Sequence, residues 1–170
     1  MSRIVTVFAG AASVALALVL STQINGFSQT FAAAGTRAKI TGPVNQKQQL
    51  HRLVVQVDVN EPAIMNLALN NVSNVARHYQ ELGQEVAIEV VAFGPGLHML
   101  RDDTSPVKER IKSISEAIPQ LTFSACGNTR ENMTKVEAKD IPLISQAKVV
   151  KAGVVRLMEL QEQGWSYLRP

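Results

Sequence analysis

Short apolar runs alternate with helical patterns along residues 51–170, and this alternation limits the possible folds more than any other feature of the chain. Residues 53–59 are rich in β-branched side chains, as a strand covered on both faces is. Residues 64–82 then carry apolar side chains at spacings of three and four, which predicts a helix. Because strands that alternate with helices form parallel sheets with helices on both faces, we predict an α/β fold.

The same pattern continues to the end of the chain and predicts five strands. The later strands are expected at residues 85–93, 121–125, 148–151 and 165–168. Helical segments are expected at residues 97–100, 107–118 and 153–163, whereas residues 133–140 are expected to be largely irregular, with a short helical piece at 134–137. We therefore expect a mostly parallel five-stranded sheet in a three-layer arrangement.

The beginning of the chain has the features of a targeting segment. An uncharged apolar run over residues 4–20 follows Arg3, and Ala32 and Ala34 meet the small-residue rule for signal-peptide cleavage. We predict a signal peptide over 1–34, a linker over 35–50 and one α/β domain over 51–170. The alternative is an uncleaved anchor, because the run approaches the roughly 20 residues that cross a bilayer. The domain is then periplasmic, either free or anchored at the inner membrane, and the leader is its one predicted membrane contact.

Composition and motifs argue against several classes of function. The net charge of +3 is spread along the chain and only 5% of residues are aromatic, which disfavours nucleic acid as a partner. The sequence has no Gly-x-Gly-x-x-Gly after its first strand and no Gly-Lys-Ser/Thr loop, so dinucleotide and P-loop binding are disfavoured. Cysteine and histidine never occur at metal-ligand spacing, so we expect neither a metal nor a cofactor.

Cys126 is the only cysteine, and it follows the strand predicted at 121–125. Gly127 and Asn128 supply a turn, and Asn128 or Thr129 is expected to cap the helical turn that follows. A thiol at this place lies beside free backbone N–H groups and the positive end of a helix, which stabilise its thiolate. The alternative is that Cys126 only fills the core, as free cysteine usually does.

Two further side chains are candidates for the chemistry of Cys126. Arg130 would add a positive charge if the turn after the cysteine is helical. His98 follows the end of another predicted strand and would form a thiol–imidazole pair if it approached Cys126, as in a conventional thiol enzyme. Whether the chain is an enzyme at all stays open at this point.

Three loops are expected to meet at one edge of the sheet. Residues 58–60, 93–96 and 125–128 each follow a predicted strand, and the carboxyl ends of parallel strands gather functional groups. A single thiol cannot form an internal disulfide, but a thiolate can carry sulfane sulfur as a persulfide, exchange with disulfides or attack an electrophile. A sulfur carrier that passes sulfur from one protein to another needs only one thiol.

Three segments of the chain resemble the DsrE/DsrF-like family of small sulfur-relay proteins, in particular its exported and mostly uncharacterised branch. They are VVAFGPGL at 90–97, FSACGNT at 123–129 and GVVRLMELQEQGWSYLRP at 153–170, and the resemblance extends from about residue 53 to residue 170. Sulfur-carrying members place their active cysteine in the middle segment, which corresponds to Cys126. The resemblance implies a flavodoxin-like layered fold and a homotrimer or homohexamer.

Two functions of different classes follow from these observations. The first is a periplasmic sulfur-handling protein that carries persulfide on Cys126 and exchanges sulfur with an unidentified partner protein or small thiol. Gly127, Asn128 and Thr129 would shape the loop around the sulfur, and Arg130 would favour the anion. The second is a non-catalytic oligomeric module that binds a small ligand at the edge of the sheet, with Cys126 as a structural residue.

Overall fold

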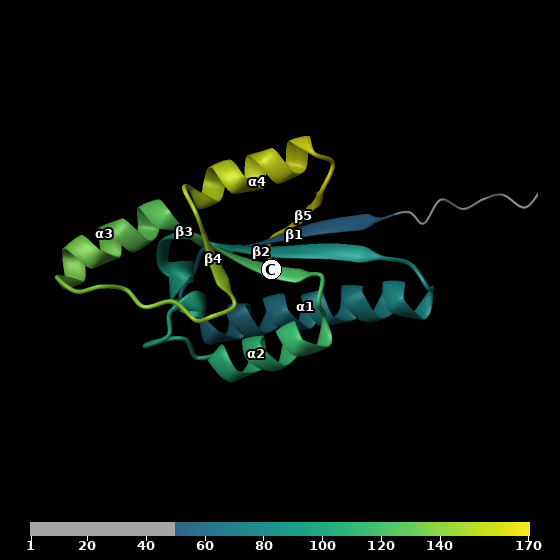
Figure 1. Ribbon diagram of the computed structural model, residues 1–170, viewed down its shortest axis with the longest axis horizontal. Helices are drawn as coiled ribbons and strands as arrows, with labels where there is room; N and C mark the ends of the chain where they lie inside the picture. Colours follow the sequence, from purple (N-terminus) through teal and green to yellow (C-terminus); the bar gives the residue numbers. More distant parts are fainter. Residues whose placement is uncertain (1–49) are drawn as a thin grey trace, which may run out of the picture. The chain divides into compact units, whose positions relative to one another are not determined.

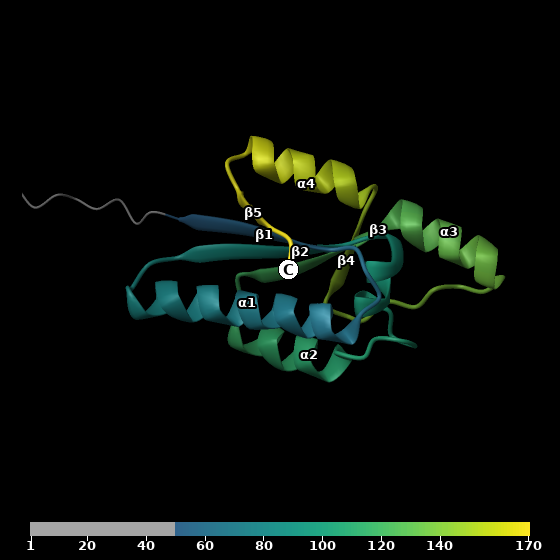
Figure 2. The same ribbon diagram turned by 180° about the vertical axis from the view of Figure 1, so that it is seen from behind.

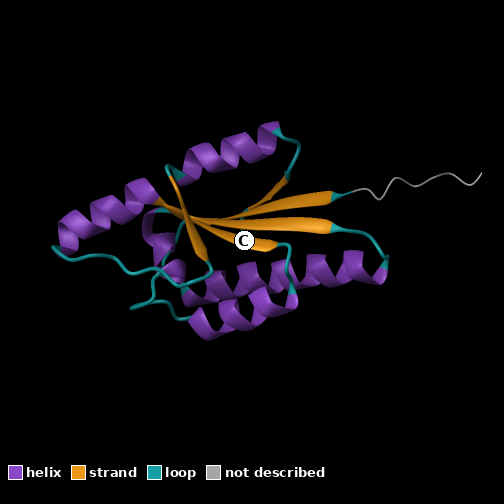
Figure 3. Ribbon diagram, viewed as in Figure 1, coloured by secondary structure: helices purple, strands orange, loops and turns teal. Residues whose placement is uncertain are grey.

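The computed structural model describes residues 50–170, which form a parallel sheet with helices on both faces (Figure 1 and Figure 3). The predicted signal peptide and all of the predicted linker except its last residue lie outside the described residues. The strands are β1 (His51–Val57), β2 (Val86–Ala92), β3 (Leu121–Cys126), β4 (Ala147–Val150) and β5 (Ser166–Leu168). The helices are α1 (Pro62–Glu81), the 3-10 helix η1 (Gly94–Leu100), α2 (Lys108–Ala117), α3 (Gly127–Glu137) and α4 (Gly153–Glu162).

The sheet has the order β4-β3-β2-β1-β5, and every neighbouring pair of strands is parallel. This confirms the predicted α/β fold with its parallel five-stranded sheet. Helices α1 and α2 cover one face and α4 covers the other, as views from opposite sides show (Figure 1 and Figure 2). Helix α4 carries the chain from β4 at one edge of the sheet to β5 at the other. Helix α3 projects beyond the carboxyl ends of the strands (Figure 1).

The core has two unequal parts, one on each face of the sheet. The larger lies under α1 and α2 and takes alternate residues of the strands, because successive strand side chains point to opposite faces. It includes Ile88 and Val90 of β2, Phe123 of β3, Met65 of α1 and Ile111 of α2. The smaller cluster lies under α4 and consists of Val54, Val91, Leu157 and Leu160, with Phe93 and Trp165 packed against it. The face under α4 therefore has fewer apolar contacts to hold its helix.

The prediction of a largely irregular segment at 133–140 is wrong, because α3 extends without a break to Glu137. Met133 and Val136 are the only large apolar residues of this helix, so it has no apolar stripe that a periodicity argument could detect. The end of α3 is held by contacts with other parts of the fold. Arg101, which is 1% exposed, donates from Nη2 to Glu137 at 2.9 Å and from Nε and Nη2 to Asp103 at 2.9 and 2.8 Å.

This ion cluster ties the end of α3 to the loop after η1. Hydrogen bonds from the Arg101 guanidinium hold the pKa of Asp103 and of Glu137 below their ordinary values. Lys139 completes the cluster, with its ammonium 3.0 Å from Asp103. A buried guanidinium needs such partners, since an unpaired buried charge is costly.

Gly96 marks the closest approach between η1 and the end of β1. A Cβ atom added at Gly96 would lie 2.2 Å from the carbonyl oxygen of Val57 and 2.7 Å from the backbone nitrogen of Asp58. The contacted atoms are backbone, so they cannot move aside as a flexible side chain would. The loops after β1 and β2 therefore lie side by side only because this position is glycine.

We expect Gly96→Ala to lower the free energy of unfolding by about 3 kcal/mol, since it forces backbone segments apart in a packed region. Gly83→Ala is the matched control. Gly83 has a positive φ of 65° but no atom near its added Cβ, so this substitution should cost only about 1 kcal/mol of backbone strain. Urea unfolding of wild type and both variants measures how much free energy of unfolding each substitution removes. Equal losses for Gly96→Ala and Gly83→Ala would contradict the close approach at Gly96.

Candidate functional site

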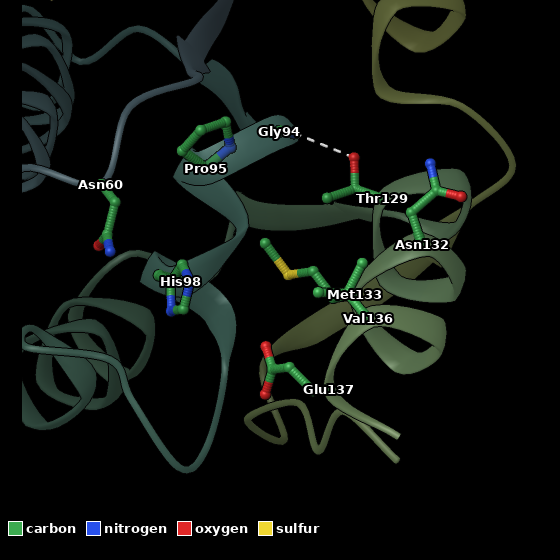
Figure 4. Close-up of a pocket in the computed structure, with 9 residues that line it drawn as sticks. All are labelled: Asn60, Gly94, Pro95, His98, Thr129, Asn132, Met133, Val136 and Glu137. Atoms are coloured by element: carbon green, nitrogen blue, oxygen red, sulfur yellow. Dashed lines mark hydrogen bonds between the residues drawn. The ribbon is translucent and has the colours of Figure 1, made fainter. Parts of the chain in front are cut away.

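The loops after β1, β2 and β3 meet at the carboxyl edge of the sheet, as their positions in the sequence predict. A pocket of about 420 Å³ opens there between η1 and α3 (Figure 4). Its lining residues come from the loop after β1, from η1 and from α3: Asn60, Gly94, Pro95, His98, Thr129, Asn132, Met133, Val136 and Glu137. In Figure 4, Asn60, Pro95 and His98 lie opposite the side chains of α3, and Met133 extends into the space between them.

Cys126 is the last residue of β3 and also the N-cap of α3. Its sulfur accepts a hydrogen bond from the backbone N–H of Thr129 at 3.5 Å. The expected cap at Asn128 or Thr129 is therefore wrong, because the helix already begins at Gly127 and the sulfur itself takes the capping position. Cys126 is 5% exposed, so the thiol is covered, but the groups that act on it include backbone N–H donors.

The start of a second helix also acts on Cys126. Gly153 is the first residue of α4, and its N–H helps to lower the pKa of the thiol. The N–H of Asn128 donates to the carbonyl oxygen of Lys151 at 3.2 Å, which joins the start of α3 to the segment before α4. An added Cβ at Gly153 would lie 2.9 Å from Cβ of Phe93, so glycine is needed for this packing. The thiol thus lies where two helix N-termini meet, and both favour a negative charge.

Burial raises the pKa of the Cys126 thiol, but hydrogen bonds to the sulfur outweigh it. The groups that lower the pKa are the side chain of Thr129 and the backbone N–H groups of Gly153, Thr129 and Asn128, of which the Thr129 N–H lies 3.5 Å from the sulfur. The pKa of Cys126 is consequently below its ordinary value of 9.0. A thiol whose pKa is lowered is a stronger candidate for chemistry than one that only fills the core.

The other predicted site residues are divided between the sulfur and the pocket. Thr129 contacts both the sulfur and the pocket. Its backbone N–H donates to the sulfur, and the residue lines the pocket. Its hydroxyl oxygen accepts a hydrogen bond from the N–H of Gly94 at 3.0 Å (Figure 4). Arg130 lies in the helical turn after the cysteine, and its Nε donates to the carbonyl oxygen of Ile141 at 2.8 Å. The groups that lower the thiol pKa belong to Thr129, Gly153 and Asn128.

His98 is part of the pocket but not of the thiol site. Its Nδ1 lies 2.8 Å from the hydroxyl oxygen of Thr104, and within residues 50–170 it makes no hydrogen bond to Cys126. The structure therefore brings Cys126 and Thr129 together and places His98 across the pocket from Thr129 (Figure 4). The thiol–imidazole pair of the conventional-enzyme hypothesis is not formed here.

Sequence reasoning missed a polar pair beneath α4. Glu89 is 4% exposed in β2, and its carboxylate accepts hydrogen bonds from Arg156 of α4 and from the hydroxyl of Ser124. Burial raises the pKa of Glu89, but the hydrogen bonds from Arg156 and Ser124 outweigh it and the net pKa is lowered. The signal in the sequence was one acidic residue within an otherwise apolar strand, which needs a buried partner.

The part of the chain that the structure describes contains no group of three or more His, Cys, Asp or Glu side chains that could hold a metal ion. None of the helices within residues 50–170 has the length and apolar character needed to cross a membrane.

Comparison with known proteins supports the fold. No family model matches the chain, and no curated protein is similar to it. A solved structure, the protein of unknown function MTH1491 from Methanobacterium thermoautotrophicum, is similar over 71% of this chain and 99% of its own. The two are 29% identical and superimpose with a TM-score of 0.60. This similarity supports the α/β fold and carries no information about activity.

We expect Thr129→Val to raise the pKa of Cys126 by about half a unit to one unit, because it removes a hydrogen bond to the charged sulfur. Since less thiolate is then present near neutral pH, alkylation by iodoacetamide should slow. Thr129→Ser, which keeps the hydroxyl, should restore most of the rate. The matched control is Thr134→Val on the same helix, outside the contacts of the sulfur. The pH dependence of the alkylation rate gives the pKa of Cys126 in wild type and in the three variants. Equal pKa values for Thr129→Val and wild type would contradict a hydrogen bond from the Thr129 hydroxyl to the sulfur.

Proposed function

We propose that this protein handles sulfane sulfur and carries it as a persulfide on Cys126. The observation that carries the proposal is the position of the thiol at the start of two helices, where backbone donors lower its pKa. The resemblance to the DsrE/DsrF-like segments around residues 123–129 agrees with this role. A periplasmic location is part of the proposal and rests on the leader predicted over residues 1–34.

The transfer needs no second cysteine and no oxidant. The thiolate of Cys126 attacks the outer sulfur of a donor persulfide, R–S–SH. The S–S bond of the donor breaks, its electron pair leaves with R–S⁻, and the new S–S bond on Cys126 carries the proton of the transferred sulfur. An acceptor thiolate then attacks that outer sulfur and regenerates the Cys126 thiolate, which the same N–H groups stabilise as a leaving group.

Access to the buried thiol is the main physical requirement of this proposal. Cys126 is 5% exposed, so the donor must reach the sulfur through a small opening. Thr129 both contacts the sulfur and lines the pocket, which makes the pocket side the favoured approach. A persulfide adds an S–S bond of about 2 Å, which extends the transferable sulfur beyond the position of Sγ.

The proposal includes self-association as a homotrimer or homohexamer. Apolar side chains on the outer face of α4 support it, since Val154, Val155 and Met158 are each about half exposed. Val149 on the edge strand β4 is exposed to a similar degree. Exposed apolar side chains that lie together are typical of contact surfaces between proteins.

Incubation of the purified protein with glutathione persulfide, followed by intact mass spectrometry, tests the proposal. We expect one added sulfur atom, removable by a reducing thiol, and none on the Cys126→Ser variant. The lowered pKa of Cys126 predicts loading at neutral pH. Absence of added sulfur, under conditions that load an established persulfide carrier, would contradict the proposal.

The pocket supports a second candidate, a module that binds a small ligand without catalysis. Its volume of about 420 Å³ is in the range of small-molecule sites, and Cys126 is not among its lining residues. Under this alternative Cys126 is a structural residue. A thiol that resists both alkylation and sulfur loading in the folded protein would favour the binding module over the sulfur carrier.

A further inference from the structure

The pocket between η1 and α3 has an apolar wall that can adapt its shape. Met133 extends into the space, and Pro95 lies on the opposite side (Figure 4). Val136 also lines the pocket and is 85% exposed, so most of its side chain is available to a ligand. Methionine is unbranched and flexible, so it packs against apolar groups of different shapes. With a volume of about 420 Å³, the pocket suits a small molecule that has an apolar body.

The charged groups beside the pocket neutralise one another. Glu137 is a lining residue, whereas no lysine or arginine among the described residues lines the pocket. The carboxylate of Glu137 accepts a hydrogen bond from Nη2 of Arg101 at 2.9 Å and lies 3.5 Å from the ammonium of Lys139. Both cations also pair with Asp103, at 2.8 and 3.0 Å. Two carboxylates thus balance two cations, and no cation is left over for a ligand.

An anionic ligand is therefore disfavoured in this pocket. It would lie beside the carboxylate of Glu137, and Arg101 could not turn toward it, because that side chain is 1% exposed and donates to two carboxylates. Moving a charge out of water without a partner is costly. The other polar lining groups include the amides of Asn60 and Asn132, which are uncharged and both donate and accept hydrogen bonds. The pocket thus favours an uncharged ligand over an anion of the same size.

Thr129 joins the pocket to the thiol. Its backbone N–H donates to the sulfur of Cys126 at 3.5 Å, and the same residue lines the pocket. Met133 follows Thr129 by four residues on α3, which is about one helical turn. A molecule whose apolar body packs on Met133 is consequently about one turn of α3 away from the residue that contacts the sulfur.

We propose that this pocket binds small uncharged thiols and persulfides with an apolar body, and that these molecules exchange sulfur with Cys126. The binding stands on the pocket alone, whereas the exchange rests on the proposed function. With an uncharged donor R–S–SH, the thiolate of Cys126 attacks the outer sulfur and the S–S bond of the donor breaks. The outer sulfur stays on Cys126 with its proton, and R–S⁻ leaves and takes a proton from water. The group R is the part that the pocket recognises.

Binding is measured by NMR of labelled methionine and valine methyl groups in the full chain with Cys126→Ser, which removes the sulfur chemistry and keeps a good helix N-cap. Benzyl thiol should shift the signals of Met133 and Val136 to saturation. The signals of Met158 and Val155, which are about half exposed on α4, are the matched controls and should not move. The uncharged para-mercaptomethyl benzamide should bind about as well as benzyl thiol, and para-mercaptomethyl benzoate about tenfold more weakly.

A substitution of Glu137 tests the role of charge. Glu137→Gln removes one of the two carboxylates that neutralise Arg101, so the benzoate should then bind about as tightly as the benzamide. The affinity for benzyl thiol should not change. Glu131→Gln is the matched control, because it removes an exposed carboxylate of α3 that does not line the pocket. It should keep the preference for uncharged ligands. If Glu137→Gln does not fold, the comparison of the three ligands still decides the proposal.

Sulfur exchange is measured on the wild-type protein by intact mass spectrometry. The donors are the persulfides of benzyl thiol and of para-mercaptomethyl benzoate, and each loading rate is divided by the rate of the same donor with free cysteine. This ratio should be about tenfold higher for the uncharged donor.

The outcomes separate this inference from the proposed function. The absence of saturable shifts at Met133, or equal affinities for benzyl thiol and the benzoate, would overturn the assignment of the pocket and leave the sulfur carrier untouched. Equal loading ratios would overturn the exchange with uncharged donors. Binding with the expected preference, but no sulfur added to Cys126 from any donor, would contradict the proposed function and leave the pocket as a binding site.

Discussion

The sulfur of Cys126 accepts a hydrogen bond from the Thr129 N–H of α3, and the N–H of Gly153 at the start of α4 also lowers the thiol pKa. Strands β3 and β4 lie side by side and end at the same edge, so α3 and α4 begin next to each other. Because α4 then crosses to the opposite edge of the sheet, its first turn passes over the end of β3. Gly127 and Gly153 allow the close contact, since an added Cβ at either position would approach neighbouring atoms within 3.1 Å.

N–H and hydroxyl groups, rather than a cation, stabilise the thiolate of Cys126. These donors carry no net charge, so they favour the thiolate of Cys126 by their orientation. Arg130, the nearest cation in sequence to the cysteine, hydrogen-bonds with Ile141 instead. The site therefore favours an anion by orientation of donors, and its strength depends on how firmly the two helix starts are held.

Local patterns in the sequence were enough to predict the sheet, the long helix α1 and the place of Cys126 at a strand end. They could not predict α3, because its stability comes from the contact of Glu137 with Arg101, a residue far away in sequence. They also could not predict that Gly153 acts on the thiol, since this depends on which strands are adjacent and where α4 crosses. The turn that carries Arg130 is helical, as the expectation for this residue required, but local patterns could not predict that its Nε donates to Ile141 in the loop after α3.

The most direct test of this account compares the pKa of Cys126 in the folded protein with its pKa in the same protein unfolded in urea, by titration of the ultraviolet absorbance of the thiolate. Folding brings the donors of α3 and α4 to the sulfur, so the folded pKa should lie below the unfolded pKa. By linkage, the folded state should then gain stability as the pH rises through the folded pKa. A folded pKa equal to or above the unfolded value would mean that burial outweighs the hydrogen bonds, and would contradict the reactive thiolate.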